Sequence, residues 1–229
     1  MKVKDHCTVF RYSVVLLALT GFFGASGCKK SGEANSSPIN SFKRYAYERA
    51  HFTYEYDGDL RGTEELFVSG YGKDEARYSR FEVFSEEGIR PVDNCTITRI
   101  ADMYVLDRIE KSYFHEHRSS FDSLYHLDGN EIPSAQEYLE SELKKNLMKN
   151  TGTEMVNGKL ASKWEGIEGG ITLWVWNSVM LRKQVSSPKG WMSLTIKSID
   201  SLWTVDTTKF VIPDGFILKD KQENAPASN

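Results

Sequence analysis

The chain has 229 residues, of which 40% are hydrophobic and 27% charged, and its formal net charge is −3. These values are ordinary for a soluble globular protein, and the absence of a basic cluster argues against a nucleic-acid partner. Aromatic residues make up 12% of the chain, which favours β structure because Tyr, Phe and Trp pack well on a pleated sheet.

The N-terminal segment has the pattern of an export signal. Lys2, Lys4 and Arg11 give it a positive start, and residues 12–23 then form an apolar run. That run is about twelve residues long, whereas a membrane-spanning helix needs ~20. The pattern predicts a signal peptide over residues 1–27.

A cysteine follows directly after this segment. The stretch Ala25-Ser26-Gly27-Cys28 resembles the lipobox of bacterial lipoproteins, although Leu is commoner where Ala25 stands. The resemblance implies that Cys28 is acylated and becomes the N-terminus. Two alternatives stay open: an ordinary secreted protein cleaved at Ala25 or Gly27, and an uncleaved membrane anchor.

Residues 28–40 are polar and predict a flexible tether between the lipid anchor and a folded domain over residues 41–218. Position 29 is Lys. An Asp there resembles an inner-membrane retention signal in enteric bacteria, so its absence favours the outer membrane, facing the periplasm. The expected localisation is therefore the cell envelope, with attachment through the lipid.

Alternation of apolar and polar residues predicts strands along most of the domain. Phe52, Tyr54 and Tyr56 occupy one face of the first strand. Residues 88–94, which include Pro91, are expected to form a loop. The further strands of this half are predicted at residues 62–69, 76–84, 95–100, 103–106 and 111–115.

One helix interrupts the strands. Ser134 and Glu137 have the spacing of a capping box, and Leu139, Leu143 and Leu147 recur every four residues. The helix is predicted to end near Asn150.

Strand patterns return after the helix. Asn157-Gly158 is a hairpin signal. Leu173 and Val175, together with Ile171, should share one sheet face, and Trp174 and Trp176 the other. Further strands are predicted at residues 180–185, 192–196 and 210–213, before a disordered tail at 219–229. The expected fold is mainly β (α+β), with about nine to eleven mostly antiparallel strands around one or two helices.

Three groups of residues resemble a known family. They are Gly62-Thr63-Glu64 with Tyr71-Gly72, Glu75-Ala76 and Tyr78; residues 152–166 followed by 173–176; and residues 210–216. They are similar to an uncharacterised family of bacterial exported proteins and lipoproteins whose layout is like that of the LolA/LolB lipoprotein carriers. The resemblance spans about 170 residues and implies an incomplete antiparallel β-barrel curved around a helix, with an apolar concave face. Carriers of that shape hold acyl chains in the cavity.

The aromatic stripes are the candidate binding residues. Phe52, Tyr54, Tyr56, Trp174 and Trp176 either belong to the ordinary sheet core or line an apolar ligand pocket.

Other reactive side chains are interpreted as structural. Cys95 is the one cysteine left in the domain, so no disulfide framework forms within the chain, and we expect a small buried residue there rather than a reactive thiol. His115 and His117, with His126 nearby, are fewer than the ligands of a zinc site need, so a polar surface hairpin is expected instead. Adjacent residues of a strand face opposite sides, so the neighbouring carboxylates Glu64-Glu65 and Glu86-Glu87 are not acid/base pairs and are expected to be solvated.

We find no nucleophile elbow, phosphate loop or Cys–His signature in the sequence. The prediction is a non-catalytic, lipid-anchored envelope lipoprotein, without metal or cofactor, that binds or carries an apolar ligand such as an acyl chain. The alternative is a protein-interaction or sensor module of the envelope. The expected partners are the membrane, through the anchor, and an apolar ligand or an envelope protein.

Overall fold

The computed structural model describes residues 42–119, 124–125, 132–188 and 190–219. The predicted signal peptide, Cys28, the tether and all but the first residue of the predicted tail lie outside this range, so these assignments stay predictions. No helix among the described residues is long and apolar enough to cross a membrane.

Twelve strands form one sheet in the order β12-β6-β5-β4-β3-β2-β1-β11-β10-β9-β8-β7. Neighbouring strands run antiparallel, except that β12 pairs with β6 in parallel over two residues. Because β7 and β12 lie at opposite ends of the order, the sheet is not closed into a barrel. The mainly β fold and the incomplete barrel are therefore confirmed. In chain order the strands are β1 (Arg49–Gly58), β2 (Leu60–Ser69), β3 (Asp74–Ser85), β4 (Gly88–Arg99), β5 (Asp102–Asp107), β6 (Ser112–His117), β7 (Met148–Val156), β8 (Lys159–Gly166), β9 (Ile171–Trp176), β10 (Val179–Ser187), β11 (Gly190–Asp200) and β12 (Ile217–Leu218).

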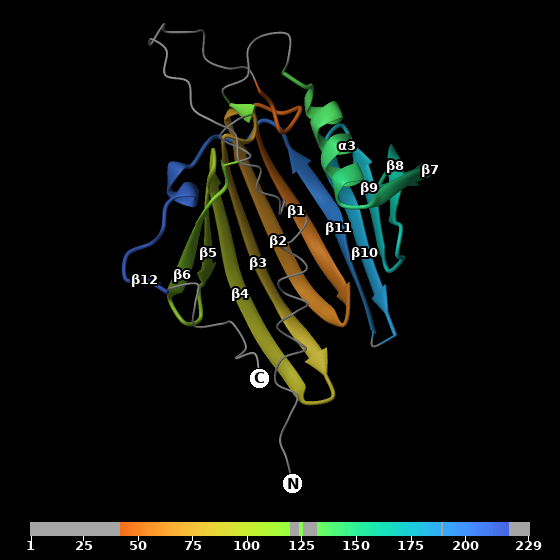
Figure 1. Ribbon diagram of the computed structural model, residues 1–229. Helices are drawn as coiled ribbons and strands as arrows, with labels where there is room; N and C mark the ends of the chain where they lie inside the picture. The colour runs from red at the N-terminus through yellow and green to blue at the C-terminus, as the bar shows by residue number, and fades with distance from the viewer. Residues whose placement is uncertain (1–41, 120–123, 126–131, 189, 220–229) are drawn as a thin grey trace, which may run out of the picture.

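The sheet is strongly curved, and Figure 1 shows the long strands β1–β4 and β10–β11 bending around one side, where α3 (Ala135–Lys145) lies. Register shifts interrupt the pairing of β1 with β11, β9 with β10, and β7 with β8. An extra residue on one strand bends the strand and increases its twist. Gly62 lets β2 approach β3 closely, because a Cβ at this position would overlap the backbone of Arg80 and Phe81. Its φ of +153° also favours glycine.

The predicted capping box begins α3. The Ser134 hydroxyl accepts a hydrogen bond from the Glu137 backbone N–H at 3.2 Å, and the Glu137 carboxylate accepts one from the Ser134 N–H at 2.8 Å. The helix ends at Lys145, five residues before the predicted end near Asn150. Leu147 has a φ of +56° and is 57% exposed. The leucine periodicity continued past a turn that leads directly into β7, so the prediction of a longer helix was wrong.

Two strand predictions also need correction. Residues 88–94 belong to β4 instead of forming a loop, and Pro91 pairs with Glu82 of β3. On its other side β4 pairs with β5 only from Asn94 onward, so the missing N–H of Pro91 faces an open edge. The closing strand at residues 210–213 is absent: residues Thr207–Phe210 form a short 3-10 helix, and Ile217–Leu218 form β12. A second 3-10 helix covers Gly70–Gly72.

The predicted hairpin at Asn157-Gly158 joins β7 to β8, with a positive φ at both residues as a type I′ turn requires. The Asn157 side-chain amide donates a hydrogen bond to the backbone carbonyl of Ile196 in β11. The tip of the hairpin is therefore fixed against β11, which lies four strands from β7 in the sheet order. This contact curls this half of the sheet over itself.

Candidate binding cavity

A cavity of about 1080 Å³ occupies the concave face of the sheet. Its volume lies slightly above the range of about 300–1,000 Å³ that ligand pockets usually occupy. Strands β1–β5 and β9–β11 supply the wall, and α3 covers part of it by packing Leu143 against Leu173 and Val175. Much of the wall is apolar; its apolar members include Leu66, Phe81, Val105, Val175, Val185 and Leu194.

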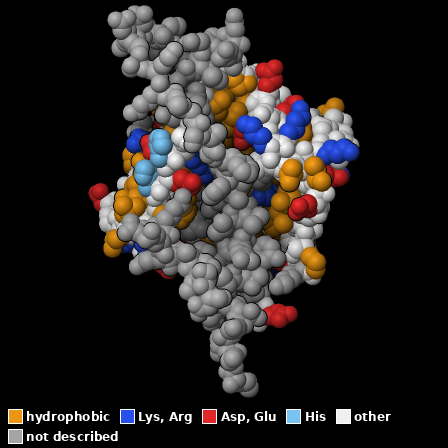
Figure 2. Space-filling view, viewed as in Figure 1, with side chains coloured by type: hydrophobic (Ala, Val, Ile, Leu, Met, Phe, Trp, Pro, Cys, Tyr) orange, Lys and Arg blue, Asp and Glu red, His pale blue; other side chains and the backbone are white. Residues whose placement is uncertain are grey.

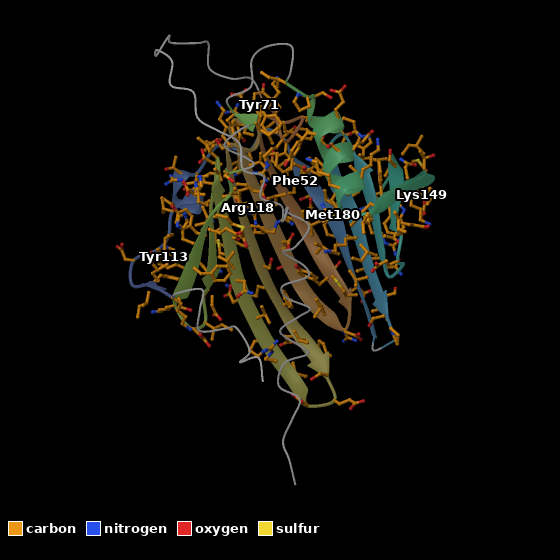
Figure 3. The ribbon with its side chains drawn as sticks, in the orientation of Figure 1. Phe52, Tyr71, Tyr113, Arg118, Lys149 and Met180 are labelled. Carbon is orange, nitrogen blue, oxygen red and sulfur yellow. The ribbon has the colours of Figure 1, made fainter. Side chains whose placement is uncertain are left out.

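The predicted aromatic stripe of β1 faces this side of the sheet. Phe52, Tyr54 and Tyr56 are buried in one apolar cluster, and Tyr54 and Tyr56 line the cavity. Phe52, labelled in Figure 3 between Arg118 and Met180, is fully buried and does not line the cavity. Two of these three residues therefore line the cavity, and their contact with a ligand stays a prediction.

The tryptophan stripe of β9 does not line the cavity. Leu173 and Val175 line it, and Trp174 and Trp176 have no place in its wall, as the alternation of side chains requires. Trp174 is buried with Val156 of β7 and donates from its indole N–H to the Glu154 carboxylate at 2.9 Å. The chain's own side chains thus cover this face. The cavity gives no support to the prediction that Trp174 and Trp176 bind a ligand.

A buried carboxylate sits in the wall of the cavity. Glu64 of β2 is 2% exposed, so the expectation that the pair Glu64-Glu65 is solvated was wrong for Glu64. Its carboxylate accepts hydrogen bonds from the Tyr56 hydroxyl at 2.7 Å, the Arg77 guanidinium at 2.6 Å and the Ser79 hydroxyl at 2.9 Å. Burying a charge costs little only when it is paired and hydrogen-bonded, and Glu64 meets both conditions.

A second buried acid extends this network. The Glu75 carboxylate accepts hydrogen bonds from Arg44 at 2.6 Å and from the Tyr45 hydroxyl at 2.7 Å, and Arg77 lies 3.6 Å from its other oxygen. Burial alone would raise the pKa of Glu75, but the two arginines and the tyrosine outweigh it and hold that pKa below its ordinary value. Glu75 is therefore ionised, and both Glu64 and Glu75 have an arginine partner.

Lys183 of β10 has no such partner. It is 4% exposed and lines the cavity beside Leu173 and Leu194, its neighbours on β9 and β11. Its ammonium makes no hydrogen bond or ion pair within the described part of the chain, and the nitrogen is not among the fully enclosed side-chain atoms without a partner, so it opens onto the cavity. Burial lowers its pKa to about 8; Glu64 opposes that shift and Arg77 adds to it.

The alternation of the strands held a signal for both Glu64 and Lys183. Glu64 is in phase with Leu66 and Val68, and Lys183 with Val185, so each occupies the inward face of its strand. What the sequence could not show is that Arg77, Tyr56 and Ser79 converge on Glu64, because that depends on the register of three strands.

The other reactive side chains lie away from the cavity. Cys95 is buried and free, and burial raises the pKa of its thiol to about 12, which favours the predicted structural role over a reactive one. His115 and His117 lie on the surface and both contact the Asp102 carboxylate, at 2.8 and 3.1 Å; Figure 2 shows histidine side chains at the left of the molecule. No group of three or more metal-ligand residues occurs among the residues that the structure describes.

Comparison with known proteins gives matches among solved structures. No protein-family model matches the chain, and no curated protein does. An uncharacterised conserved protein from Thermus thermophilus matches 78% of this chain and 94% of its own at 8% identity, with a TM-score of 0.46. The Mycobacterium tuberculosis lipoprotein LppX matches 70% of this chain and 91% of its own at 12% identity, with a TM-score of 0.30. A putative outer membrane lipoprotein-sorting protein domain from Vibrio parahaemolyticus matches 73% and 91% at 9% identity, with a TM-score of 0.27.

At these identities, what the cavity binds has to be inferred from the residues of this chain.

Proposed function

We propose that this protein is a non-catalytic, lipid-anchored lipoprotein of the bacterial envelope that binds or carries an apolar ligand, an acyl chain or a lipid, on the concave face of its sheet. One observation carries the proposal: a cavity of about 1080 Å³ with a largely apolar wall remains between the sheet and α3. An apolar surface left unfilled inside a fold is unfavourable unless something covers it, and a long alkyl chain is the complementary ligand.

Blocking the cavity tests this proposal. Val185 of β10 is half-buried in the wall, so Val185→Trp should place an indole in the ligand's space and weaken binding of a fluorescent fatty-acid probe by at least about tenfold. Gln184→Trp is the matched control, because the next residue on the same strand points to the opposite face. Probe titration of both purified variants gives the answer. Equal affinities for the two would show that the probe does not occupy the cavity.

The lipid anchor is a separate part of the proposal. Replacing Cys28 with Ser removes the thiol that a lipobox needs, so acylation should stop and a precursor about 27 residues too long should accumulate. Metabolic labelling with a palmitate analogue, followed by gel analysis, measures both effects. Undiminished label in the variant would contradict the proposed lipid anchor at Cys28. The proposed outer-membrane location, facing the periplasm, is checked by density-gradient fractionation of the wild type, where recovery only with inner-membrane markers would contradict it.

The protein-interaction or sensor module stays the second candidate because of one observation. β7 lies at the end of the sheet, and among the described strands it pairs only with β8. An exposed strand edge can accept a strand from a partner protein. Native mass spectrometry of the purified protein separates the two functions, since co-purified lipid favours the carrier and a bound protein favours the module.

A further inference from the structure

Among the described buried charged side chains that line the cavity, Lys183 is the one outside the ion-pair network. Glu64 and Glu75 bind Arg77 and Arg44, so each buried carboxylate has a guanidinium partner. Lys183 is then left over as an additional buried cation. Arg118, labelled in Figure 3, lines the same cavity, as do charged side chains of both signs: Arg90, Asp59, Glu86, Glu87 and Glu142. These side chains are exposed or only half-buried, whereas Lys183 is buried.

The position of Lys183 separates it from those acids. Glu64 lies on β2 and Lys183 on β10, and β1 and β11 stand between them in the sheet. Three strand spacings amount to about 14 Å along the sheet, beyond the reach of a direct hydrogen bond between neighbours. The strands between the two contribute Tyr56 and Leu194 at this level. The Lys183 ammonium therefore ends in a wall made largely of apolar and aromatic side chains.

A buried ammonium without a partner is unfavourable, and an anion is the group that relieves it. The surrounding wall suits an alkyl chain, and the cation suits the head to which that chain is attached. A carboxylate and a phosphate monoester both present oxygen atoms to such a cation, so they share the required chemistry.

Building on the proposed function, we infer that the ligand is an anionic amphiphile, a single-chain fatty acid or alkyl phosphate, whose negatively charged head binds Lys183 while its alkyl chain lies along the apolar wall of the cavity. Lys183 is then a specificity-determining residue of the binding site. A neutral amphiphile of the same length would leave the ammonium without a partner and should bind more weakly.

The test compares four amphiphiles of equal chain length: dodecanoate, dodecyl phosphate, dodecanol and dodecyltrimethylammonium. Each displaces a neutral fluorescent probe from the purified protein at pH 7. The wild type should prefer dodecanoate or dodecyl phosphate to dodecanol by about tenfold or more, and should bind the cationic amphiphile most weakly. Lys183→Met should abolish this preference. Lys197→Met is the matched control, because Lys197 lies on β11 with an exposed side chain that pairs with Glu55, and its removal changes the net charge equally.

Each outcome has a distinct meaning. A preference for only one of the two anions supports the inference and identifies the head group. If dodecanol binds the wild type as well as dodecanoate does, the inference is overturned while the apolar-ligand function stands. A preference that persists in Lys183→Met also overturns it, because the anion site would lie elsewhere. If none of the four binds the wild type, the proposed function fails as well. Displacement of the probe by dodecanol in Lys183→Met verifies that this variant is folded.

Discussion

Glu64→Gln is expected to lower the free energy of unfolding at pH 7 by about 3 kcal/mol, the usual scale for removing one partner of a buried ion pair. Three donors converge on this carboxylate, from Tyr56, Arg77 and Ser79. An amide is neutral and offers one acceptor oxygen, so its NH₂ group must face a donor. Arg77 would lose its ion pair with Glu64 at 2.6 Å, and its remaining ion pair would be the longer one to Glu75, at 3.6 Å. Urea denaturation followed by circular dichroism measures the change.

Glu65→Gln is the matched control, since it changes the same atoms one residue away on the solvent face. Glu65 is exposed and contacts His51 at 3.0 Å. Surface ion pairs contribute about 0–1 kcal/mol, so this variant should lie within ~0.5 kcal/mol of wild type. Similar losses in the two variants would mean that the buried network contributes no more than a surface pair. In a double-mutant cycle, Glu64→Gln and Arg77→Met should be strongly non-additive, because each removes the same contact.

The contrast between Glu64 and Glu65 shows where sequence reasoning succeeded and failed. Alternation correctly placed the two carboxylates on opposite faces, because the side-chain period of a strand is fixed by its backbone. The assumption that both faces at that point are solvated was wrong. Whether an inward position meets water depends on the neighbouring strands, and Arg77 and Ser79 come from a different strand of the sheet.

Local chemistry was otherwise the reliable guide to the fold. The capping box at Ser134 and the Asn157-Gly158 turn are determined by a few adjacent residues, and both were predicted correctly. The end of α3 and the position of the last strand were not, because a leucine repeat cannot show that the chain turns at Leu147 to begin β7. The cavity was expected from the resemblance, whereas its unpaired cation was not, since a single lysine carries no motif.

That cation gives the second large effect. Lys183→Met should stabilise the ligand-free protein at pH 7 by about 3 kcal/mol, because burial lowers the pKa of Lys183 from 10.5 to about 8 and each unit corresponds to roughly 1.4 kcal/mol. Glu64 and Arg77, the charged groups that act on this ammonium, have opposite effects on that pKa, so desolvation determines its direction. Methionine keeps the length of the side chain and fits the same apolar wall without a charge.

The pH dependence distinguishes this cause from better packing. Between about pH 8 and 10.5 the unfolded chain binds a proton at Lys183 that the folded chain has released, so the wild type should gain stability from this group as the pH rises through that window. The advantage of Lys183→Met should therefore be complete below pH 8 and shrink toward zero by pH 10.5. Urea denaturation of both proteins at several pH values tests this, and Lys197→Met, whose ammonium is exposed, should differ from wild type by less than ~0.5 kcal/mol.

A constant advantage across the whole range would assign the effect to packing, and a variant no more stable than wild type at pH 7 would mean that the ammonium is already compensated. If the predicted curve is found, the fold carries a buried charge that weakens it and that an apolar residue could replace. Such a sacrifice of stability is typical of binding sites, where a group is kept for its partner. An anionic head bound at Lys183 would return that stability to the complex, so saturating dodecanoate should raise the stability of the wild type more than that of Lys183→Met.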